Sequence, residues 1–202
     1  GANDIESDFA STQLQAQTDG LTGLINRRTL ETELRELMRQ GRAFALALAD
    51  LDHFKKLNDT HGHEEGDRSL RLFSHVMRQV LRDNDHVARW GGEEFLIALP
   101  DADADGAVEV MERIRAHLAR TLDGGQVRFT ASFGVTDSTA ASSLQELIQL
   151  ADVGLYQSKA AGRDRTSVGA WNGVREALGS GNGARRAPAL HRAAADDEPN
   201  TE

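Results

Sequence analysis

The chain has 202 residues, of which 39% are hydrophobic, so it can bury one good core and still carry additional segments. The absence of cysteine excludes a disulfide scaffold and thiolate metal sites, and it fits a reducing compartment. A formal net charge of −9 argues against a nucleic-acid binder, so any phosphate ligand has to be held by a few placed cations, helix ends or a metal.

The two ends of the chain differ from its middle. Residues 1–17 are mostly polar, with apolar residues at near-helical spacing, which predicts a helix or linker from an upstream region or, alternatively, a frayed terminus. Residues 172–202 lack apolar periodicity and are expected to be disordered. Because the chain begins with Gly1, we expect a longer protein, with its domain at residues 18–171. No apolar run of membrane length or signal peptide is present, so this piece is expected to be soluble, without direct membrane contact.

The domain begins with a predicted helix and a central strand. Residues 19–26 form a turn-rich loop, and Asn26 can cap a helix whose apolar stripe ends before Gly41. The segment Ala43–Asp50 is apolar on both alternating faces, which predicts a strand covered on both sides by other layers.

An acidic pair, Asp50 and Asp52, ends this strand and precedes a short helical segment at residues 53–59. Carboxylates next to a helix N-terminus can hold a divalent cation and a polyphosphate together. The alternative is simple capping of the helix by Asp52, which does not require Asp50.

Two histidines, His61 and His63, follow this segment at a spacing that suggests zinc ligands. No other part of the chain supplies a matching ligand cluster, so a loop between two helices is the better interpretation. The second helix is predicted from Asp67 onward, and it ends near residues 83–85.

A hairpin with an acidic turn is predicted next. His86–Trp90 and Phe95–Leu99 are rich in β-branched, aromatic and aliphatic residues, and the pair Gly91–Gly92 tolerates the backbone angles of a tight turn. Glu93 and Glu94 stand beside this turn, where adjacent carboxylates repel each other unless a cation lies near them. The turn is therefore either a ligand site, with glycines that let a ligand approach the backbone, or only a polar hairpin tip.

The second half of the domain repeats helix and strand. A third helix carries apolar residues from Ala107 to Leu122, and Val127–Val135 alternates strictly, which predicts a half-buried strand. Ser142 and Gln145 form a predicted capping box for a fourth helix. Thr166–Trp171 could add a last strand.

Lys159 and Arg163 lie one turn apart at the end of the fourth helix, so both can reach the same side. The alternative is that they complement the negative end of the helix dipole. Taken together, the elements fold most simply as an α/β (α+β) protein with a mixed, mostly antiparallel central sheet of about five strands flanked by helices.

Several separated segments resemble the GGDEF family of diguanylate cyclases. The matching residues are Asp19, Leu21–Leu24 and Asn26–Arg28 at the start; Asp50–Asp52, Phe54–Lys55, Asn58–Asp59, Gly62–His63 and Gly66–Asp67 in the middle; Gly91–Phe95 at the hairpin; and Ala151–Asp152, Leu155–Tyr156, Lys159 and Gly162–Arg163 near the end. The chain departs from the commoner family residues at Glu93, Trp90, Gly154 and Asp164, and Gly154 is expected to loosen its helix slightly.

The resemblance implies a ferredoxin-like palm core of the nucleotidyl-cyclase type and a metal-dependent reaction. Two GTP would condense to cyclic di-GMP and two pyrophosphates, by attack of a 3′-hydroxyl on an α-phosphate across a homodimer. Asp50, the Leu51 carbonyl and Glu93 would hold Mg²⁺ or Mn²⁺, with Glu94 in a second-metal or acid–base role. Lys55 would stabilise charge in the transition state.

The same resemblance implies a substrate site and a regulatory site. Backbone N–H groups near His53 and Phe54, with Lys159 and Arg163, would hold the β- and γ-phosphates, and Asn58 and Asp67 would read guanine with support from His63. The residues implied for an inhibitory product site are Arg82, Asp85 and Arg113. For Arg82 and Asp85, the alternative is a helix-terminal arginine followed by a turn-forming aspartate.

Three functions remain open at this point. The first is an active diguanylate cyclase, which the intact acids and cations favour. The second is a catalytically silent domain that binds GTP or cyclic di-GMP, and the third is an adenylyl cyclase or polymerase-like palm enzyme, against which Asn58 and Asp67 argue. In each case we expect a cytoplasmic location, including the cytoplasmic part of a larger sensor or membrane protein.

Overall fold

The computed structural model describes residues 10–13 and 16–171. Residues 10–13 and 16–17 are helical, in agreement with the helix predicted within residues 1–17. The rest of that segment, and the tail 172–202 for which disorder is predicted, lie outside the described residues.

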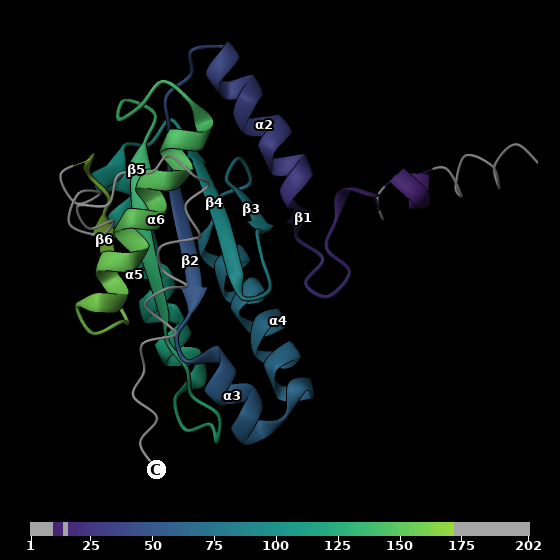
Figure 1. Ribbon diagram of the computed structural model, residues 1–202. Coiled ribbons are helices and arrows are strands. Elements are labelled where there is room, and N and C mark those ends of the chain that lie inside the picture. Colours follow the sequence, from purple (N-terminus) through teal and green to yellow (C-terminus); the bar gives the residue numbers. More distant parts are fainter. Residues whose placement is uncertain (1–9, 14–15, 172–202) are drawn as a thin grey trace, which may run out of the picture.

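The described residues form one mixed sheet and its flanking helices (Figure 1). In chain order the elements are β1 (Ile25–Asn26), α2 (Arg27–Arg39), β2 (Phe44–Leu51), α3 (Phe54–His61), α4 (His63–Val80), β3 (His86–Arg89), β4 (Glu94–Pro100), α5 (Ala104–Leu122), β5 (Ala131–Asp137), α6 (Leu144–Ala160) and β6 (Thr166–Val168). The strand order is β1-β3-β4-β2-β5-β6. Strand β2 pairs antiparallel with both of its neighbours, while β1 and β6 pair parallel at the edges.

The predicted fold class is confirmed, with six strands instead of about five. The additional strand is β1, which lies in the segment 19–26 that the sequence predicted as a loop. Its two residues pair with β3. None of the helices in the described ranges combines the length and hydropathy needed to cross a bilayer.

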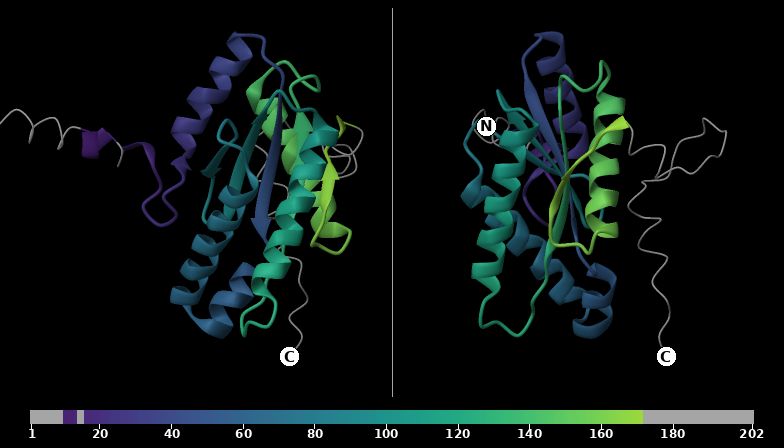
Figure 2. Two further views of the ribbon diagram at one scale, coloured as in Figure 1. Left: turned by 180° about the vertical axis from the view of Figure 1, so that it is seen from behind. Right: turned by 90° about the vertical axis from the view of Figure 1, so that its left-hand side faces the viewer.

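Helices cover both faces of the sheet (Figure 2). In β2 the side chains of Ala45, Ala47 and Ala49 pack with α4 and α5 on one face, and those of Phe44, Leu46 and Leu48 pack with α2 and α6 on the other. All eight residues of β2 are buried, as predicted for a central strand. Because residues alternate between faces along a strand, Asp50 belongs to the face that α6 covers.

Some element boundaries follow the sequence signals and others differ from them. The Asn26 side chain accepts a hydrogen bond from the Thr29 N–H at 3.0 Å, so the predicted cap of α2 is confirmed. The cap of α6 is Ser143, which accepts from the Glu146 N–H, and the predicted box at Ser142 was wrong by one residue. Helix α4 begins at His63, earlier than predicted, and Gly62 separates it from α3, as expected for a loop between two helices.

Strand β5 also differs from its prediction. It begins at Ala131, not Val127, and residues 131–136 are buried on both faces. The predicted half-buried strand was wrong because Gly134 leaves room for α6 to lie directly on it. A methyl group on Gly134 would come within 2.0 Å of the Ala151 carbonyl oxygen and 2.1 Å of the Leu155 nitrogen.

Gly154 of α6 contributes to the same close approach. A methyl group there would lie 2.6 Å from the Ser167 carbonyl oxygen and 3.0 Å from the Gly134 Cα. Glycine at position 154 lowers the helix propensity of α6, but it also allows the close packing of α6 on the sheet. The two glycines together let the helix approach β5 and β6, which places its last turn near the end of β2.

We predict that Gly134→Ala lowers the free energy of unfolding by roughly 2 kcal/mol, because the new methyl group meets backbone atoms that cannot rotate away. Urea denaturation of the purified chain measures this change. The matched control is Gly20→Ala, where a methyl group meets nothing within 4 Å, and we expect it to shift stability by less than about 0.5 kcal/mol. Equal stability of the two variants would contradict the packing role.

Candidate active site

The site is built on a row of polar side chains across three neighbouring strands. Asp50 pairs with Glu94 of β4 on one side and with Ser132 of β5 on the other. Directly opposed residues of antiparallel strands share a face, with Cβ atoms about 5 Å apart. Asp50 and Glu94 are only 2% and 4% exposed, so two carboxylates stand side by side in a nearly dry environment. Such a pair requires a cation.

Lys159 of α6 supplies one cation. Its ammonium donates to the Asp50 carboxylate at 2.5 Å, and both side chains are almost completely buried. Removing either partner would leave a buried charge uncompensated, which costs about 3–5 kcal/mol. Lys159, which is predicted to hold phosphates, thus contacts Asp50, which is predicted to hold the metal.

The acidic turn is closed by backbone hydrogen bonds beside this pair. The Glu94 carbonyl accepts from the N–H groups of Trp90 and Gly91, at 2.8 and 3.2 Å. The Leu51 N–H donates to the Glu93 carbonyl at 3.3 Å, so the turn lies against the end of β2. The end of β2 that carries Asp50 and the Gly-Gly-Glu-Glu turn are therefore neighbours in the structure.

The donor set fits a hard divalent cation. Asp50, Glu93, Glu94 and the Leu51 carbonyl carry oxygen atoms on adjoining stretches of backbone, and oxygen ligands are what Mg²⁺ and Mn²⁺ prefer. Within the described residues no three Asp, Glu or His side chains already converge as a finished metal site. Asp50 is instead engaged by Lys159.

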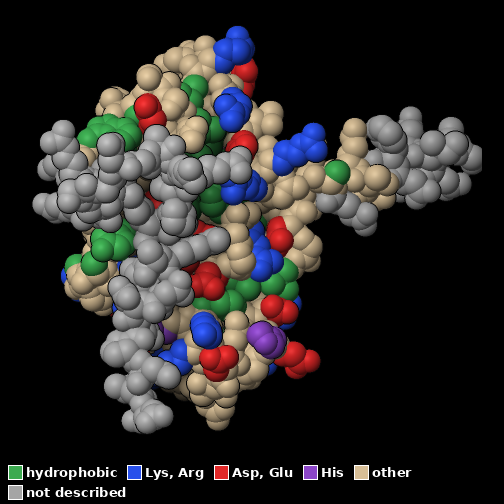
Figure 3. Space-filling model, in the orientation of Figure 1, with side chains coloured by type: hydrophobic (Ala, Val, Ile, Leu, Met, Phe, Trp, Pro, Cys, Tyr) green, Lys and Arg blue, Asp and Glu red, His purple; other side chains and the backbone are tan. Residues whose placement is uncertain are grey.

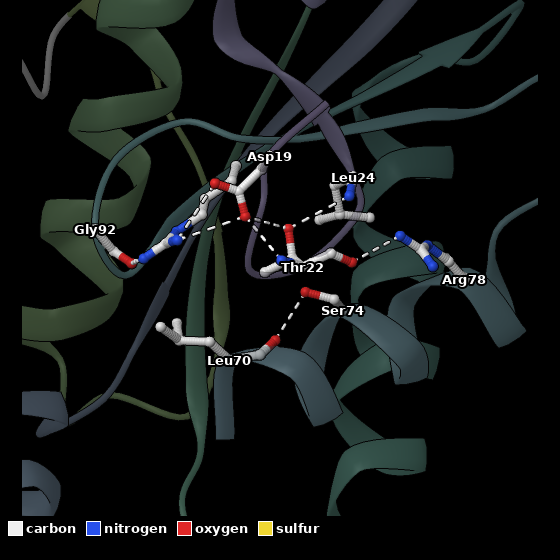
Figure 4. A network of polar contacts seen from close by, with 8 residues as sticks. Asp19, Thr22, Leu24, Leu70, Ser74, Arg78 and Gly92 are labelled. Atoms are coloured by element: carbon white, nitrogen blue, oxygen red, sulfur yellow. Dashed lines mark hydrogen bonds and ion pairs between the residues drawn. The ribbon is translucent and has the colours of Figure 1, made fainter. Parts of the chain in front are cut away.

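Arg89 holds the turn in place, and sequence reasoning missed it. Its guanidinium donates to the Gly92 carbonyl at 2.7 and 3.1 Å and contacts Asp19 at 3.4 Å. Asp19 also accepts from the N–H and hydroxyl of Thr22, and these side chains form one network with the turn (Figure 4). The available signal was an arginine two residues before the Gly91–Gly92 pair.

Asp52 does not cap α3, so the simple capping alternative was wrong. Its buried carboxylate accepts from the hydroxyls of Thr130 and Ser132 at 2.6 and 2.7 Å and from the Asp164 N–H at 3.1 Å. The cap residue is His53, which has a left-handed backbone (φ 54°) and makes no side-chain cap.

The turn after α6 is strained. Arg163 and Asp164 both have positive φ angles, 62° and 48°, and follow Gly162. Each such residue other than glycine costs about 1–2 kcal/mol unless other contacts fix it.

The predicted guanine residues are brought together by the pairing of α3 and α4. The Asn58 side chain lies over Gly66, where a methyl group would come within 1.8 Å of the Asn58 Oδ1. This oxygen is buried and accepts no hydrogen bond in the described part of the chain. Asp67 follows Gly66 and is exposed, as is His63 at the start of the same helix. The absence of a side chain at Gly66 thus makes room for the Asn58 amide.

The remaining predicted residues lie on the surface around this site. Lys55 is exposed on α3, and Phe54 is half-buried against α4. In the space-filling view, acidic side chains lie in the middle of this face near the end of β2, with Lys, Arg and His side chains over α3 below them (Figure 3). Gly92 is exposed and Gly91 is half-buried, so the tip of the turn is accessible.

The predicted product-site residues lie at the opposite end of α4. The Asp85 carboxylate accepts a hydrogen bond from the Arg82 N–H at 2.8 Å. Asp85 therefore does form a turn, as the alternative to a product site predicts. The side chains of Arg82, just after the end of α4, and Arg113 of α5 are both exposed, and α4 and α5 pack together. An 18-residue helix spans about 27 Å, so these residues are far from the start of α4.

The site is thus a buried acidic row at the end of the central strand of a mixed sheet, beside an acidic turn and a lysine carried by a helix. The family model described as "Diguanylate cyclase, GGDEF domain" matches residues 16–165. The chain belongs to this GGDEF family. Enzymes of the family are metal-dependent nucleotidyl cyclases.

Individual relatives agree with this assignment. The diguanylate cyclase DgcP of Pseudomonas aeruginosa is 38% identical over 161 residues, which is 76% of this chain and 24% of that protein. The coiled coil and GGDEF domain of DgcB from Caulobacter crescentus, solved in complex with c-di-GMP, matches with a TM-score of 0.72 and 30% identity over 83% of this chain and 93% of that chain. The active GGEEF domain of a Vibrio cholerae diguanylate cyclase matches with a TM-score of 0.66 and 28% identity over 72% and 97%. The chain spans less than half the length of the first curated relatives it matches, from 24% to 46%.

We predict that the contacts of the ionised Asp19 carboxylate with Thr22 and Arg89 stabilise the domain at neutral pH and are lost at acidic pH. Burial raises the pKa of the Asp19 carboxyl, but hydrogen bonds from Thr22 and the charge of Arg89 outweigh it, so the pKa lies below its ordinary value of 3.8. A carboxyl with a lowered pKa contributes its full stability above 3.8 and loses it as the pH falls through the folded-state value. Asp19→Asn should therefore cost about 1 kcal/mol at pH 7, and this difference should shrink near pH 3.

Urea unfolding of both proteins at the two pH values measures this effect. Asp59→Asn, at an exposed position of α3, is the matched control and should follow the parent chain at neutral pH. A difference between Asp19→Asn and the parent that is the same at both pH values would contradict the electrostatic account.

Proposed function

We propose that the chain is a diguanylate cyclase that condenses two GTP into cyclic di-GMP and two pyrophosphates. The observation that carries the proposal is the register of β2 and β4, which puts Asp50 opposite Glu94 on a buried face beside the accessible Gly91–Gly92 tip. Membership of the GGDEF family supports the same reaction. Because GTP is a cytoplasmic nucleotide, we also propose a cytoplasmic location.

Asp50, Glu93 and the Leu51 carbonyl are proposed to hold Mg²⁺ or Mn²⁺, with Glu94 beside them as a further ligand or as the acid–base group. When bound, such an ion would reduce the charge on the phosphate under attack and lower the pKa of the 3′-hydroxyl. Gly91 and Gly92 leave the ligand room to approach the backbone.

The chain offers separate groups for the two ends of GTP. The backbone N–H groups at the start of α3, near His53 and Phe54, are proposed to bind the β- and γ-phosphates together with Lys159 and Arg163. Lys55 would approach the same phosphates from α3 and stabilise charge in the transition state.

Asn58 and Asp67 are proposed to read guanine, with His63 supporting the pocket. A carboxylate accepts from the N1–H and N2–H₂ of guanine, whereas adenine offers no such donor pair. The buried Asn58 Oδ1, which accepts no hydrogen bond in the described residues, supports this assignment. Discrimination by such buried polar groups is strong because the wrong base leaves them unpaired.

One site holds one GTP, whereas the product contains two guanylate units. We therefore propose that two copies of the domain meet face to face, each presenting GTP to the other. The DgcB structure in complex with c-di-GMP is consistent with nucleotide binding in this family. The rate per chain should consequently rise with chain concentration.

We predict that incubation with GTP and Mg²⁺ yields cyclic di-GMP and pyrophosphate, identified by chromatography and mass spectrometry, and that ATP yields neither. Glu93→Gln should lower the rate by at least about 100-fold, because a ligand or proton acceptor is lost. Glu93 is preferred to Asp50 here, since Asp50 also pairs with buried Lys159 and its loss would cost stability.

Asp59→Asn serves as the active control, and circular dichroism confirms that each variant is folded. A parent chain that binds GTP without turnover would instead support a second function, a catalytically silent GTP- or cyclic di-GMP-binding domain. The occupation of Asp50 by Lys159 is the observation that favours this second function.

We further propose that cyclic di-GMP inhibits the enzyme at Arg82, Asp85 and Arg113. Both arginines are exposed, Arg82 just after α4 and Arg113 on α5, and Asp85 accepts the turn hydrogen bond with one carboxylate oxygen, which leaves the other for a ligand. Paired arginines suit phosphates because their guanidinium groups bind two oxygens at once.

We predict that Arg82→Ala weakens product inhibition at least about tenfold while the initial rate stays within about twofold, because Arg82 follows the end of α4 opposite to the proposed guanine contacts. Initial rates measured against added cyclic di-GMP give both values. Arg120→Ala, an exposed arginine of α5, is the control and should keep the parent inhibition constant. Unchanged inhibition in Arg82→Ala would remove this site.

A further inference from the structure

The turn that carries Arg163 adopts a conformation that it does not favour by itself. Gly162, Arg163 and Asp164 have consecutive positive φ angles of 115°, 62° and 48°. Only glycine adopts this region without steric cost, so two of the three residues must be held there by surrounding contacts. One restraint comes from Asp52, directly after the end of β2.

Asp52 restrains the turn from the inside. Its carboxylate accepts the Asp164 backbone N–H at 3.1 Å, and the same N–H is shared with the Ser132 hydroxyl at 3.1 Å. The carboxylate is itself fixed by the hydroxyls of Thr130 and Ser132. Asp52 is 3% exposed, so these contacts are screened little by water.

A second restraint acts from the outside. Arg115 of α5 contacts the Asp164 carboxylate at 3.0 Å and is held in turn by Glu112 at 2.9 Å. Glu112 also accepts from the Thr166 hydroxyl at the start of β6. These contacts are more exposed than those of Asp52, so they brace the turn less firmly.

Asp50 and Asp52 therefore fasten the end of α6 at two adjacent points. Both belong to the same face at the end of β2, where Asp50 receives Lys159 and Asp52 receives the backbone of the following turn. Arg163 follows Lys159 by four positions along the chain, so the two contacts position both of the cations proposed to face the phosphates.

We propose that Asp52 is a positioning residue for triphosphate binding: it sets the left-handed turn at 162–164 and thereby the place of Arg163. This inference rests on the proposed function, because it takes Arg163 as a phosphate contact. It assigns to the second aspartate of the Asp50–Asp52 pair a role separate from metal binding, since its oxygens are engaged by donors of the protein.

The test compares two guanine nucleotides on the parent chain and on Asp52→Asn. Affinities for a non-hydrolysable GTP analogue and for GMP are measured by calorimetry with Mg²⁺ present. We expect Asp52→Asn to bind the GTP analogue at least about tenfold more weakly, and to bind GMP within about twofold of the parent, because the guanine contacts of Asn58 and Asp67 are unaffected. A general loss of structure would weaken both ligands together.

A double-mutant cycle tests whether Asp52 affects the binding of the GTP analogue through Arg163. In an Arg163→Ala background, Asp52→Asn should cause no further loss of affinity for the GTP analogue, because its effect passes through Arg163. An equal loss in both backgrounds would overturn the inference, as would an unchanged affinity in a folded Asp52→Asn chain.

If Asp52→Asn does not fold, Ser132→Ala replaces it. This variant removes one of the two acceptors of the Asp164 N–H, and the same selective loss for the GTP analogue is expected at reduced size. Equal affinities for Ser132→Ala and the parent would then overturn the inference. Failure of the parent chain itself to bind the GTP analogue is a distinct outcome, which would overturn the proposed function and this inference with it.

Discussion

The buried ion pair between Asp50 and Lys159 is the interaction on which the rest of the site depends. It joins two residues 109 positions apart in the sequence, at 2.5 Å, in a place where neither side chain is open to water. A carboxylate there without a cation would carry a large desolvation cost, particularly beside Glu94. The pair therefore fixes the end of α6 over the end of β2, and it keeps a site of high negative charge compatible with a folded core.

The packing of α6 makes this pair possible. The helix reaches the sheet because Gly134 and Gly154 present no side chains between them, and backbone lies almost against backbone. A chain with larger residues at these positions would hold the helix farther from β5. Lys159 would then have to span a longer distance to Asp50. Close packing in the middle of α6 thus determines whether Lys159, at the end of the helix, can reach Asp50.

The acidic turn is held independently of α6. Arg89 clamps the Gly92 carbonyl and joins it to Asp19, in the loop that precedes the first helix. Arg27, at the start of that helix, also stacks on the Trp90 ring at 4.2 Å. Residues near the start of the domain therefore contact Arg89 and Trp90, the two residues directly before the Gly-Gly turn, and so help to position the acidic turn.

The sequence by itself determined the order of elements, the buried central strand, the hairpin and the residue types of the site. Each of these follows from local periodicity or from turn chemistry, which neighbouring residues express without distant contacts. Only the tertiary structure decided that Asp52 braces a turn instead of capping α3, that Arg89 holds the acidic turn, and that Lys159 lies on Asp50. These partners are far apart in the chain, and the register of β2 with its neighbours and the depth at which α6 packs select them.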